Sequence, residues 1–463
     1  MRAISHRVIL FAMVVYAVAV SPAAWGRQKP QRETELVANP TFASPAGQSV
    51  PHEWTLQPLP VKEACCRVRA VDGGLAVDAP ERPFGVGIVW QDLHGIEGQK
   101  CYAVDVSAKA EKIPSPCRSI LVRLTWTRGG QPLHPAGIMV RGPSAADGGL
   151  RFAEVVVAPK EADGARLSLE VKWPQGGSVL WQRAGLHAAA PPPPRKVKIG
   201  TVYLRPRNST SQRNLQLFCD QVDEAGRLKL DIVCLPEAIT LVGTSNSGPQ
   251  TAEPIPGPSS ERLARAASKN HLWLVAGLYE RDGATVYNTA VLLDREGRLA
   301  GKYRKIHLPR EEWQLGVTPG KDYPVFRTDF GTIGIQVCYD YFFPEEDAIL
   351  RLKGAEVVFA PTWGTTFKDQ EGRVEGENVF RVRARDNGIY LVPSVYDGNS
   401  MVIDPLGRVL ATSDGREGLV WCEVDLSRRE PLAWVGCWRR LGPRDRMPTS
   451  YEGLLGDPAA PAE

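Results

Sequence analysis

The stretch Gly334-Ile335-Gln336-Val337-Cys338-Tyr339-Asp340 begins as an apolar strand and ends in a turn. Residues 332–337 are predicted to form a buried strand, and residues 345–352 are predicted to form the helix that follows it. A strand end holds a thiol rigidly, and a turn after it leaves backbone N–H groups available to an oxyanion. This strand–turn–helix unit predicts an α/β domain with Cys338 as a candidate nucleophile.

The chain on both sides of this stretch alternates strands with helices. Further strands are predicted at 197–204, 231–235, 272–279, 285–293, 356–361, 389–393, 400–403, 409–411 and 419–424. Further helices are predicted at 211–228, from Ser259 or Ser260 to 270, and at 374–386. Such alternation indicates a sheet whose faces are covered by helices. Residues 197–430 are therefore predicted to form one α/β domain, and residues 431–463 an irregular tail that packs on a partner subunit.

A proline-rich segment separates this domain from a different one. Residues 189–196 contain Pro191 to Pro194 and are predicted to be an extended linker. Before it, residues 35–188 contain short alternating runs such as 119–126 and 166–171, punctuated by Gly, Pro and Asp, which predict an all-β sandwich. The opening residues 36–42 resemble the start of carbohydrate-binding-type jelly-roll modules. A spacer and a glycan-binding module are both compatible with this pattern.

Composition and the first residues limit the function classes. A length of 463 residues predicts two domains, and a formal charge of +4 without basic runs between aromatics excludes a nucleic-acid partner. The seven histidines show no metal-ligand spacing, so neither a metal nor an organic cofactor is expected. Residues 1–26, with Arg2, Arg7 and the apolar run 8–20, predict a cleaved signal peptide and export to the periplasm or medium. The alternative is an uncleaved anchor, but the run is shorter than the roughly 20 residues that span a bilayer. No later segment is apolar enough to span a membrane.

Nine cysteines are present, which is an odd number. In an oxidising compartment some of them would pair, and at least one would stay free. Cys338 is the expected free thiol. Cys101 with Cys117 and Cys422 with Cys437 are two possible pairs, which the sequence does not decide.

Three residues just past predicted strands form a candidate catalytic set: Glu237, Lys305 and Cys338. Individually they have ordinary explanations, as a turn cap, a solvated basic residue and a small buried side chain. A thiol with a pKa near 8.5 needs a base or a positive field before it attacks a carbonyl, and Glu237 and Lys305 supply both. Two residues beyond Lys305, His307 is expected to orient its loop through hydrogen bonds.

The segments that contain these residues resemble the motifs of the nitrilase (carbon–nitrogen hydrolase) superfamily. They are Leu235-Pro236-Glu237, residues 303–308, and residues 338–345, in that order. The resemblance covers residues 197–425. It implies an αββα sandwich that associates as a homo-oligomer, and it implies no cofactor.

The resemblance also implies roles for the residues. Glu237 would be the general base, Cys338 would form an acyl-enzyme, and Lys305 with the Tyr339 backbone N–H would stabilise the oxyanion. A second glutamate in the loop after the lysine is implied, for which Glu312 fits best and Glu311 is the alternate. Two aromatics, Trp363 and Tyr396, are expected either to line the substrate pocket or to lie in the core.

The run after Cys338 resembles amidase and carbamoyl-amine hydrolase branches more than true nitrilases. We therefore expect an exported thiol hydrolase that cleaves a non-peptide amide or N-carbamoyl C–N bond of a small molecule. An acyltransferase using the same site and a non-catalytic, glycan-binding protein are the alternatives. A reactive Cys338 with a low pKa would distinguish an enzyme from a binding protein.

Overall fold

A computed structural model describes residues 34–45, 49–80, 84–364, 376–429, 431–432, 434–451 and 454. The predicted signal peptide, residues 1–26, lies outside the described residues. Within the described ranges, every helix is too short or too polar to cross a membrane.

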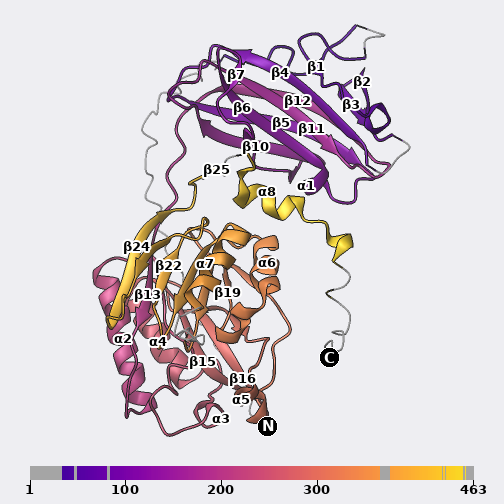
Figure 1. The fold of residues 1–463 in the computed structure, drawn as a ribbon. Coiled ribbons are helices and arrows are strands. Elements are labelled where there is room, and N and C mark those ends of the chain that lie inside the picture. Colours follow the sequence, from indigo (N-terminus) through magenta and orange to yellow (C-terminus); the bar gives the residue numbers. More distant parts are fainter. Residues whose placement is uncertain are drawn as a thin grey trace, which may run out of the picture. The chain divides into compact units, whose positions relative to one another are not determined.

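The first part of the chain consists of two antiparallel sheets (Figure 1). One sheet has the order β1 (Thr55–Leu56), β4 (Val86–His94), β11 (Gly164–Lys172), β6 (Ile120–Arg128) and β7 (Gln131–Pro132), with β8 (Ile138–Met139) also paired to β6. The other has the order β2 (Arg67–Val71), β3 (Gly74–Asp78), β12 (Ser178–Ala189), β5 (Cys101–Glu111), β10 (Gly149–Val157) and β9 (Ser144–Ala146). Two short helices, η1 (Lys62–Ala64) and α1 (Pro116–Ser119), interrupt the strands.

The alternation of apolar residues explains why these strands form a sandwich. In β5, every second residue from Tyr102 to Ala108 is buried, as the two-residue period of a strand requires. The buried side chains of both sheets form one core, which includes Phe152, Leu167 and Trp181. The all-β sandwich that the sequence predicts for this region is confirmed.

The second part contains two six-stranded sheets. The first has the order β17 (Leu299–Arg304), β16 (Thr285–Leu293), β15 (Trp273–Asp282), β14 (Ile232–Cys234), β13 (Lys196–Tyr203) and β24 (Gly418–Asp425). The second has the order β18 (Val325–Arg327), β19 (Thr332–Ile335), β20 (Val357–Pro361), β21 (Tyr390–Ser394), β22 (Met401–Ile403) and β23 (Val409–Thr412). The helices are α2 (Ser211–Arg227), α3 (Gly248–Thr251), α4 (Pro258–Asn270), α5 (Arg310–Gln314), η2 (Cys338–Phe342), α6 (Pro344–Leu352) and α7 (Gly376–Asn387).

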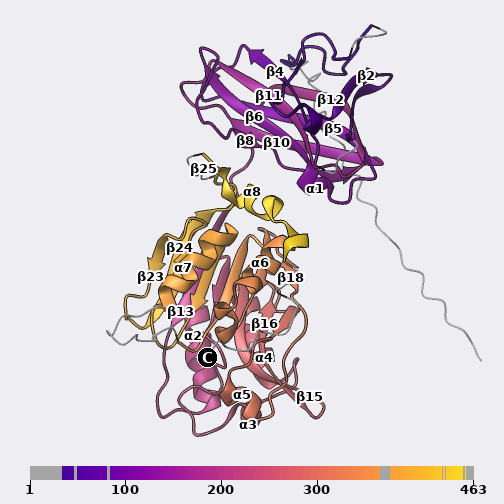
Figure 2. The same cartoon turned by 45° about the vertical axis from the view of Figure 1, so that its right-hand side comes forward.

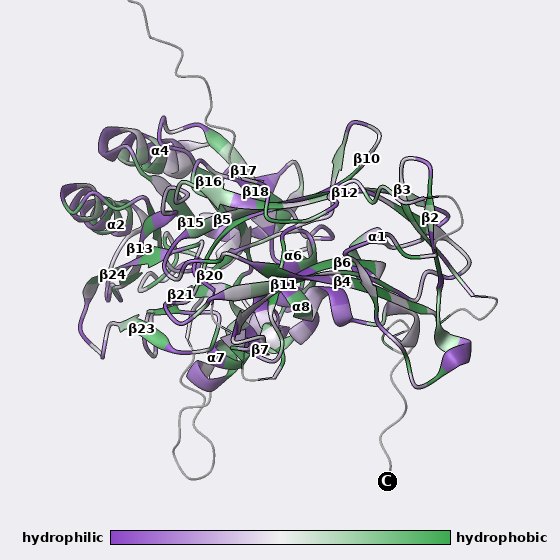
Figure 3. Cartoon of the chain, turned by 90° about the horizontal axis from the view of Figure 1, so that it is seen from above, coloured by the Kyte–Doolittle hydropathy of each residue, from purple (hydrophilic) through white to green (hydrophobic). Residues whose placement is uncertain are grey.

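Three apolar clusters show that these elements form four layers. Side chains such as Ile199 and Phe359 pack between the two sheets. Phe218 of α2 and Leu263 of α4 pack on the outer face of the first sheet, and Leu350 and Phe380 of α6 and α7 pack on the outer face of the second. Figure 2 shows α6 and α7 beside the second sheet, and Figure 3 shows hydrophilic segments along α2 and α4. The predicted αββα sandwich is confirmed.

The C-terminal segment contains regular structure where the sequence predicts an irregular tail. It forms β25 (Pro431–Leu432), β26 (Gly436–Cys437), α8 (Trp438–Asp445) and η3 (Pro448–Ser450). Pro443 lies inside α8, and a proline in that position removes the usual helical signal from the sequence.

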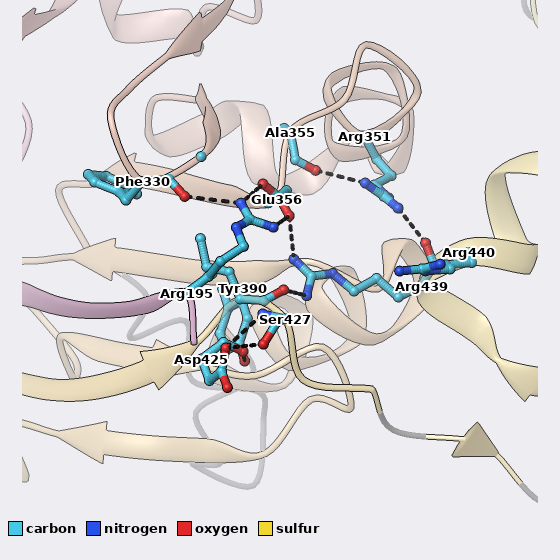
Figure 4. A network of polar contacts seen from close by, with 12 residues as sticks. Arg195, Phe330, Arg351, Ala355, Glu356, Tyr390, Asp425, Ser427, Arg439 and Arg440 are labelled. Atoms are coloured by element: carbon cyan, nitrogen blue, oxygen red, sulfur yellow. Dashed lines mark hydrogen bonds and ion pairs between the residues drawn. The ribbon is translucent and has the colours of Figure 1, made fainter. Parts of the chain in front are cut away.

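Glu356, just before β20, is the centre of a polar network that involves this segment (Figure 4). Its carboxylate accepts hydrogen bonds from Arg195 at 2.6 and 3.0 Å and forms a longer contact with Arg439 of α8 at 3.4 Å. Arg351 donates to the Arg439 backbone carbonyl. Burial raises the pKa of Glu356, but the two guanidinium groups outweigh burial and lower the pKa below its ordinary value.

The expected disulfides do not form. All nine cysteines, each among the described residues, are free thiols, so the possible pairs Cys101–Cys117 and Cys422–Cys437 are wrong. Cys338 is free, as expected.

Candidate active site

The predicted site residues follow the ends of strands that belong to both facing sheets. Strands β13, β14 and β15 are parallel in one sheet, and β19, β20 and β21 are parallel in the other. Glu237 follows β14, Lys305 follows β17, Cys338 follows β19 and Trp363 follows β20. Because polar side chains at strand ends are fixed by the buried strands behind them, the two sheets together position the site.

The Lys305 ammonium lies between two carboxylates. Its Nζ is 2.9 Å from Oε1 of Glu237 and 2.8 Å from Oε2 of Glu312. All three side chains are buried, and Lys305 is only 1% exposed. Burial lowers the pKa of the Lys305 ammonium, but the charges of Glu237, Cys338 and Glu312 outweigh it and raise the pKa well above its ordinary value. Lys305 is therefore a permanent cation in this site.

The positions of Glu311 and Glu312 show which of these two candidates for the second glutamate faces Lys305. Glu312 lies in α5 and faces Lys305, whereas its neighbour Glu311 is exposed. Burial raises the pKa of Glu312, and the charge of Glu237 raises it further, although Lys305 opposes both. The two carboxylates and one ammonium thus carry an excess of negative charge, which makes the site receptive to a proton.

Two residues to which the sequence assigns no role complete this cluster. Asn288 of β16 donates through Nδ2 to Oε1 of Glu237 at 2.6 Å and to Oε1 of Glu312 at 2.5 Å. The Asn288 carbonyl also accepts the Lys305 backbone N–H at 2.8 Å. Tyr279 of β15 donates its hydroxyl proton to Glu312 at 2.9 Å. Only the geometry shows what Asn288 and Tyr279 contact, because the two glutamates lie far from them in the sequence.

Cys338 is the first residue of η2 and has a left-handed backbone with φ of +47°. The Glu237 side chain and the Trp363 backbone are close enough to the thiol to influence its pKa. Burial raises the pKa of the Cys338 thiol, the charge of Glu237 raises it further, and Lys305 only partly opposes them. The pKa of the thiol is therefore raised, because burial and a carboxylate outweigh the ammonium, so a low thiol pKa does not distinguish an enzyme from a binding protein here. Glu237 is placed to remove the thiol proton during attack.

The three predicted substrate-binding residues have different positions. The backbone N–H of Tyr339 lies in the first turn of η2. The N–H groups of a first turn have no acceptor inside the helix. Trp363 is half-buried and packs against Tyr396 with ring centroids 5.3 Å apart. Tyr396 is fully buried in the core, and its hydroxyl donates to the Glu237 carbonyl at 2.6 Å. Tyr396 thus supports Glu237 from the core and does not line a pocket, which is the second of its two expected positions.

One group of side chains among the described residues has the geometry of metal ligands. Ligand atoms of His307, Asp340 and Glu346 lie within 4.8 Å of one another. Asp340 already accepts hydrogen bonds from the backbone and ring nitrogens of His307, both at 2.9 Å. These bonds give His307 the loop-orienting contacts that the sequence predicts, and they engage the Asp340 oxygen that a metal would need.

A sandwich of two facing sheets with a thiol, a carboxylate and an ammonium at the strand ends is the architecture of the nitrilase superfamily. The carbon-nitrogen hydrolase family matches residues 198–433 of the sequence. The chain belongs to this family, and it is an amidase-type hydrolase of carbon–nitrogen bonds.

Individual relatives are similar over about half of the chain. A probable nitrilase of Schizosaccharomyces pombe is 31% identical over 278 residues, which are 56% of this chain and 99% of the relative. An omega-amidase of Homo sapiens is 30% identical over 240 residues, which are 48% of this chain and 86% of the relative. The crystal structure of a carbon-nitrogen hydrolase from Helicobacter pylori is 25% identical, with a TM-score of 0.50 and coverage of 56% of this chain and 99% of that one.

Proposed function

We propose that the protein cleaves a non-peptide amide or an N-carbamoyl C–N bond of a small molecule through a covalent acyl-enzyme on Cys338. The observation that carries the proposal is the buried Glu237 carboxylate, which pairs with the Lys305 ammonium at 2.9 Å and whose charge also acts on the Cys338 thiol. A base in this position can take the thiol proton while the ammonium keeps its own.

The first half-reaction follows from these contacts. Glu237 takes the thiol proton as the sulfur of Cys338 attacks the carbonyl carbon, and the carbonyl π electrons move to oxygen. The Lys305 ammonium and the Tyr339 N–H are available to donate to this oxyanion, each worth about 2.7–4 kcal/mol in well-studied enzymes. The oxyanion then collapses, the C–N bond breaks, and protonated Glu237 gives its proton to the departing amine or ammonia.

The second half-reaction uses the same carboxylate. Glu237 takes a proton from water, the resulting hydroxide attacks the thioester carbonyl, and the C–S bond breaks. The proton returns to the thiolate, which restores the free thiol, and a carboxylic acid or carbamic acid is released. Glu312 keeps its ion pair with Lys305 on the opposite side throughout the reaction. The ammonium therefore stays in place when Glu237 gains or loses a proton.

The sequence after Cys338 favours an amide or carbamoyl substrate over a nitrile, whereas the relatives include both an omega-amidase and a probable nitrilase. One relative is described as an omega-amidase, whose substrate is an amide by name. Tyr279 belongs to an apolar cluster, and Leu241, Leu308 and Trp363 pack against this cluster. Such a surface suits an uncharged acyl group next to the scissile bond.

The test is ammonia release from a panel of amides, N-carbamoyl amines and nitriles. Wild-type protein is compared with Cys338→Ala and with Cys117→Ala, which removes an exposed cysteine as the matched control. We expect release that Cys338→Ala abolishes and Cys117→Ala retains, together with an acyl adduct on Cys338 in the intact mass. Ammonia release at equal rates from all three proteins would contradict the proposal. Amine-dependent acyl transfer without hydrolysis would support the acyltransferase instead.

Export and assembly are further parts of the proposal. The Arg2, Arg7 and 8–20 pattern supports export, and N-terminal sequencing of protein recovered from the periplasm or medium tests cleavage near residue 26. We propose a homo-oligomer from the family resemblance, which light scattering of the purified protein tests. A glycan contact of the β-sandwich is tested by binding of Cys338→Ala protein to immobilised glycans.

A further inference from the structure

Behind the turn that carries Cys338 lies a second group of buried acids that the proposed reaction does not use. Asp340 of η2 and Glu346 and Asp347 of α6 are all fully buried. Tyr303 of β17 and His307 contact them. The segment that contains Tyr303 and His307 also contains Lys305, so this group of acids lies between the lysine segment and the cysteine turn.

Asp340 joins these two segments through both of its carboxylate oxygens. Oδ1 accepts the backbone N–H and the ring Nδ1–H of His307, both at 2.9 Å. Oδ2 accepts the backbone N–H of Val337 at 2.9 Å and the hydroxyl of Tyr303 at 2.8 Å. Three nitrogens and one hydroxyl thus lie within hydrogen-bond distance of the two Asp340 oxygens.

The hydroxyl of Tyr303 then requires a second proton nearby. Its oxygen is 2.8 Å from Oδ2 of Asp340 and 2.7 Å from Oε1 of Glu346. A phenol carries one proton and donates it to one acceptor. Since one phenol proton serves only one of the two carboxylates, both short contacts are hydrogen bonds only if one of the two acids is protonated and donates to the Tyr303 oxygen. Asp340 has three further nitrogens around it, which leaves Glu346 as the better place for this proton.

Most of the groups around Glu346 also favour its protonated form. Burial raises the pKa of Glu346 to about 9, and the charges of Asp340 and Asp347 add to the shift, although hydrogen bonds from Tyr303 and Tyr323 oppose it. His307 is the cation-forming group on this side, with Nδ1 3.5 Å from Oε2 of Glu346.

We propose that Glu346 is a positioning residue that acts as a neutral carboxylic acid, donating to Tyr303 and thereby fixing Asp340, the cysteine turn and the lysine segment in register. The proposal rests on the function proposed above. Loss of this proton in alkaline solution would place two carboxylates in contact and break the hydrogen bond to Tyr303. The turn would then lose its alignment with Lys305, which lowers kcat more than it raises KM.

The kinetic test compares the pH dependence of wild type, Glu346→Gln and Glu346→Ala. A glutamine keeps a donor toward Tyr303 and cannot ionise, so Glu346→Gln should keep near-wild-type kcat at neutral pH and move the alkaline fall of kcat upward by about one pH unit or more. Glu346→Ala should lower kcat by about 10–100-fold with little change in KM. An alkaline fall that is identical in wild type and Glu346→Gln would overturn the proposal, as would wild-type kcat in Glu346→Ala.

A second measurement does not depend on catalysis or on the alanine variant. Infrared spectroscopy of Cys338→Ala protein should show a carboxylic-acid carbonyl band at neutral pH that disappears as the pH rises through about 9. The band that disappears near pH 9 should be absent from the double variant with Glu346→Gln and present in the double variant with Asp347→Asn, the matched control. Burial raises the pKa of Asp347 to about 7, so a band from Asp347 is distinguished by its loss at this lower pH. Absence of the band from Cys338→Ala protein overturns the proposal even if the hydrolase is active. Its presence supports the neutral acid even if no tested substrate is cleaved.

Discussion

Two clusters of paired charges in the α/β part of the chain have opposite compositions. The cluster around Lys305 has two carboxylates and one ammonium, and all three groups are buried. The network around Glu356 has one carboxylate contacted by two guanidinium groups, and Arg195 is 30% exposed there. In the first cluster the pKa of a carboxyl group, that of Glu312, is raised, and in the second the pKa of Glu356 is lowered.

The difference lies in which charge is in excess. An excess of carboxylates favours the protonated form of a carboxyl group such as Glu312, and an excess of guanidinium groups favours the ionised form of Glu356. Removing one partner should therefore affect both activity and stability in the first cluster, and stability alone in the second.

The largest effect is expected from Lys305→Met. This change removes the ammonium and leaves two buried carboxylates without a cation, so we expect kcat to fall by about 10³-fold. The same loss should reduce the free energy of unfolding by about 3–5 kcal/mol at neutral pH. Steady-state kinetics and urea denaturation measure both. Lys321→Met, at an exposed lysine, is the control, and a similar loss of activity in it would contradict the assignment.

Asn288→Ala should have the next largest effect. It removes the amide that donates to both glutamates, which then repel each other more strongly. We expect kcat to fall by about 10²-fold, in line with the loss of other groups that orient catalytic residues. Unchanged kcat would show that Lys305 alone aligns the two carboxylates.

Gly277→Ala tests the position of the Glu237 backbone. A Cβ at Gly277 would lie 2.6 Å from the Cα of Glu237 and 2.9 Å from the Pro236 carbonyl, so Glu237 must move. We expect about a tenfold loss of kcat and a loss of stability of about 1–3 kcal/mol. Gly334→Ala is the matched change in the second sheet, where a Cβ meets only the Leu350 side chain, at 3.1 Å or more. A larger loss of activity in Gly334→Ala than in Gly277→Ala would contradict this account.

Glu356→Gln should give the smallest loss of activity. The variant should lose about 2 kcal/mol of unfolding free energy at neutral pH, because Arg195 and Arg439 lose their carboxylate in a half-buried place. Since the pKa of Glu356 is lowered on folding, this stabilisation is present above the pKa of the unfolded chain and is lost as the pH falls through the folded value. Thermal unfolding of both proteins as a function of pH should therefore converge in acid, while kcat at neutral pH stays the same. Unfolding temperatures of the two proteins that diverge in acid would contradict a lowered pKa of Glu356 in the folded chain.

Much of the architecture is predictable from the sequence because local patterns carry it. Strand 285–293 has the same bounds in prediction and structure, and the helix predicted at 211–228 is α2. Helix α4 begins one residue before the first predicted cap, with Gly257 as N-cap, because Pro258 fills the first helical position. Strands β17 and β18 were not predicted, since Leu299–Arg304 is polar and Val325–Arg327 is short.

The contents of the site were only partly predictable. The order of three motifs predicts that Glu237, Lys305 and Cys338 meet, and the structure brings them together. The roles of Asn288, Tyr279 and Tyr396 depend on contacts between residues far apart in the chain, which no local pattern encodes. The direction of the Cys338 pKa shift also depends on the folded chain, because burial is its largest cause.

The left-handed backbone of Cys338 limits which nucleophiles evolution or an engineer can place at this turn. For a side chain without a branch at Cβ, such as that of serine, the left-handed conformation has a steric cost of roughly 1–2 kcal/mol, the same as for cysteine. Threonine adds a methyl group to that crowded Cβ, so it is a poor replacement even though its hydroxyl is a competent nucleophile elsewhere. The geometry of one peptide unit thus restricts this scaffold to unbranched nucleophiles, and a hydroxyl-based descendant would have to pass through serine.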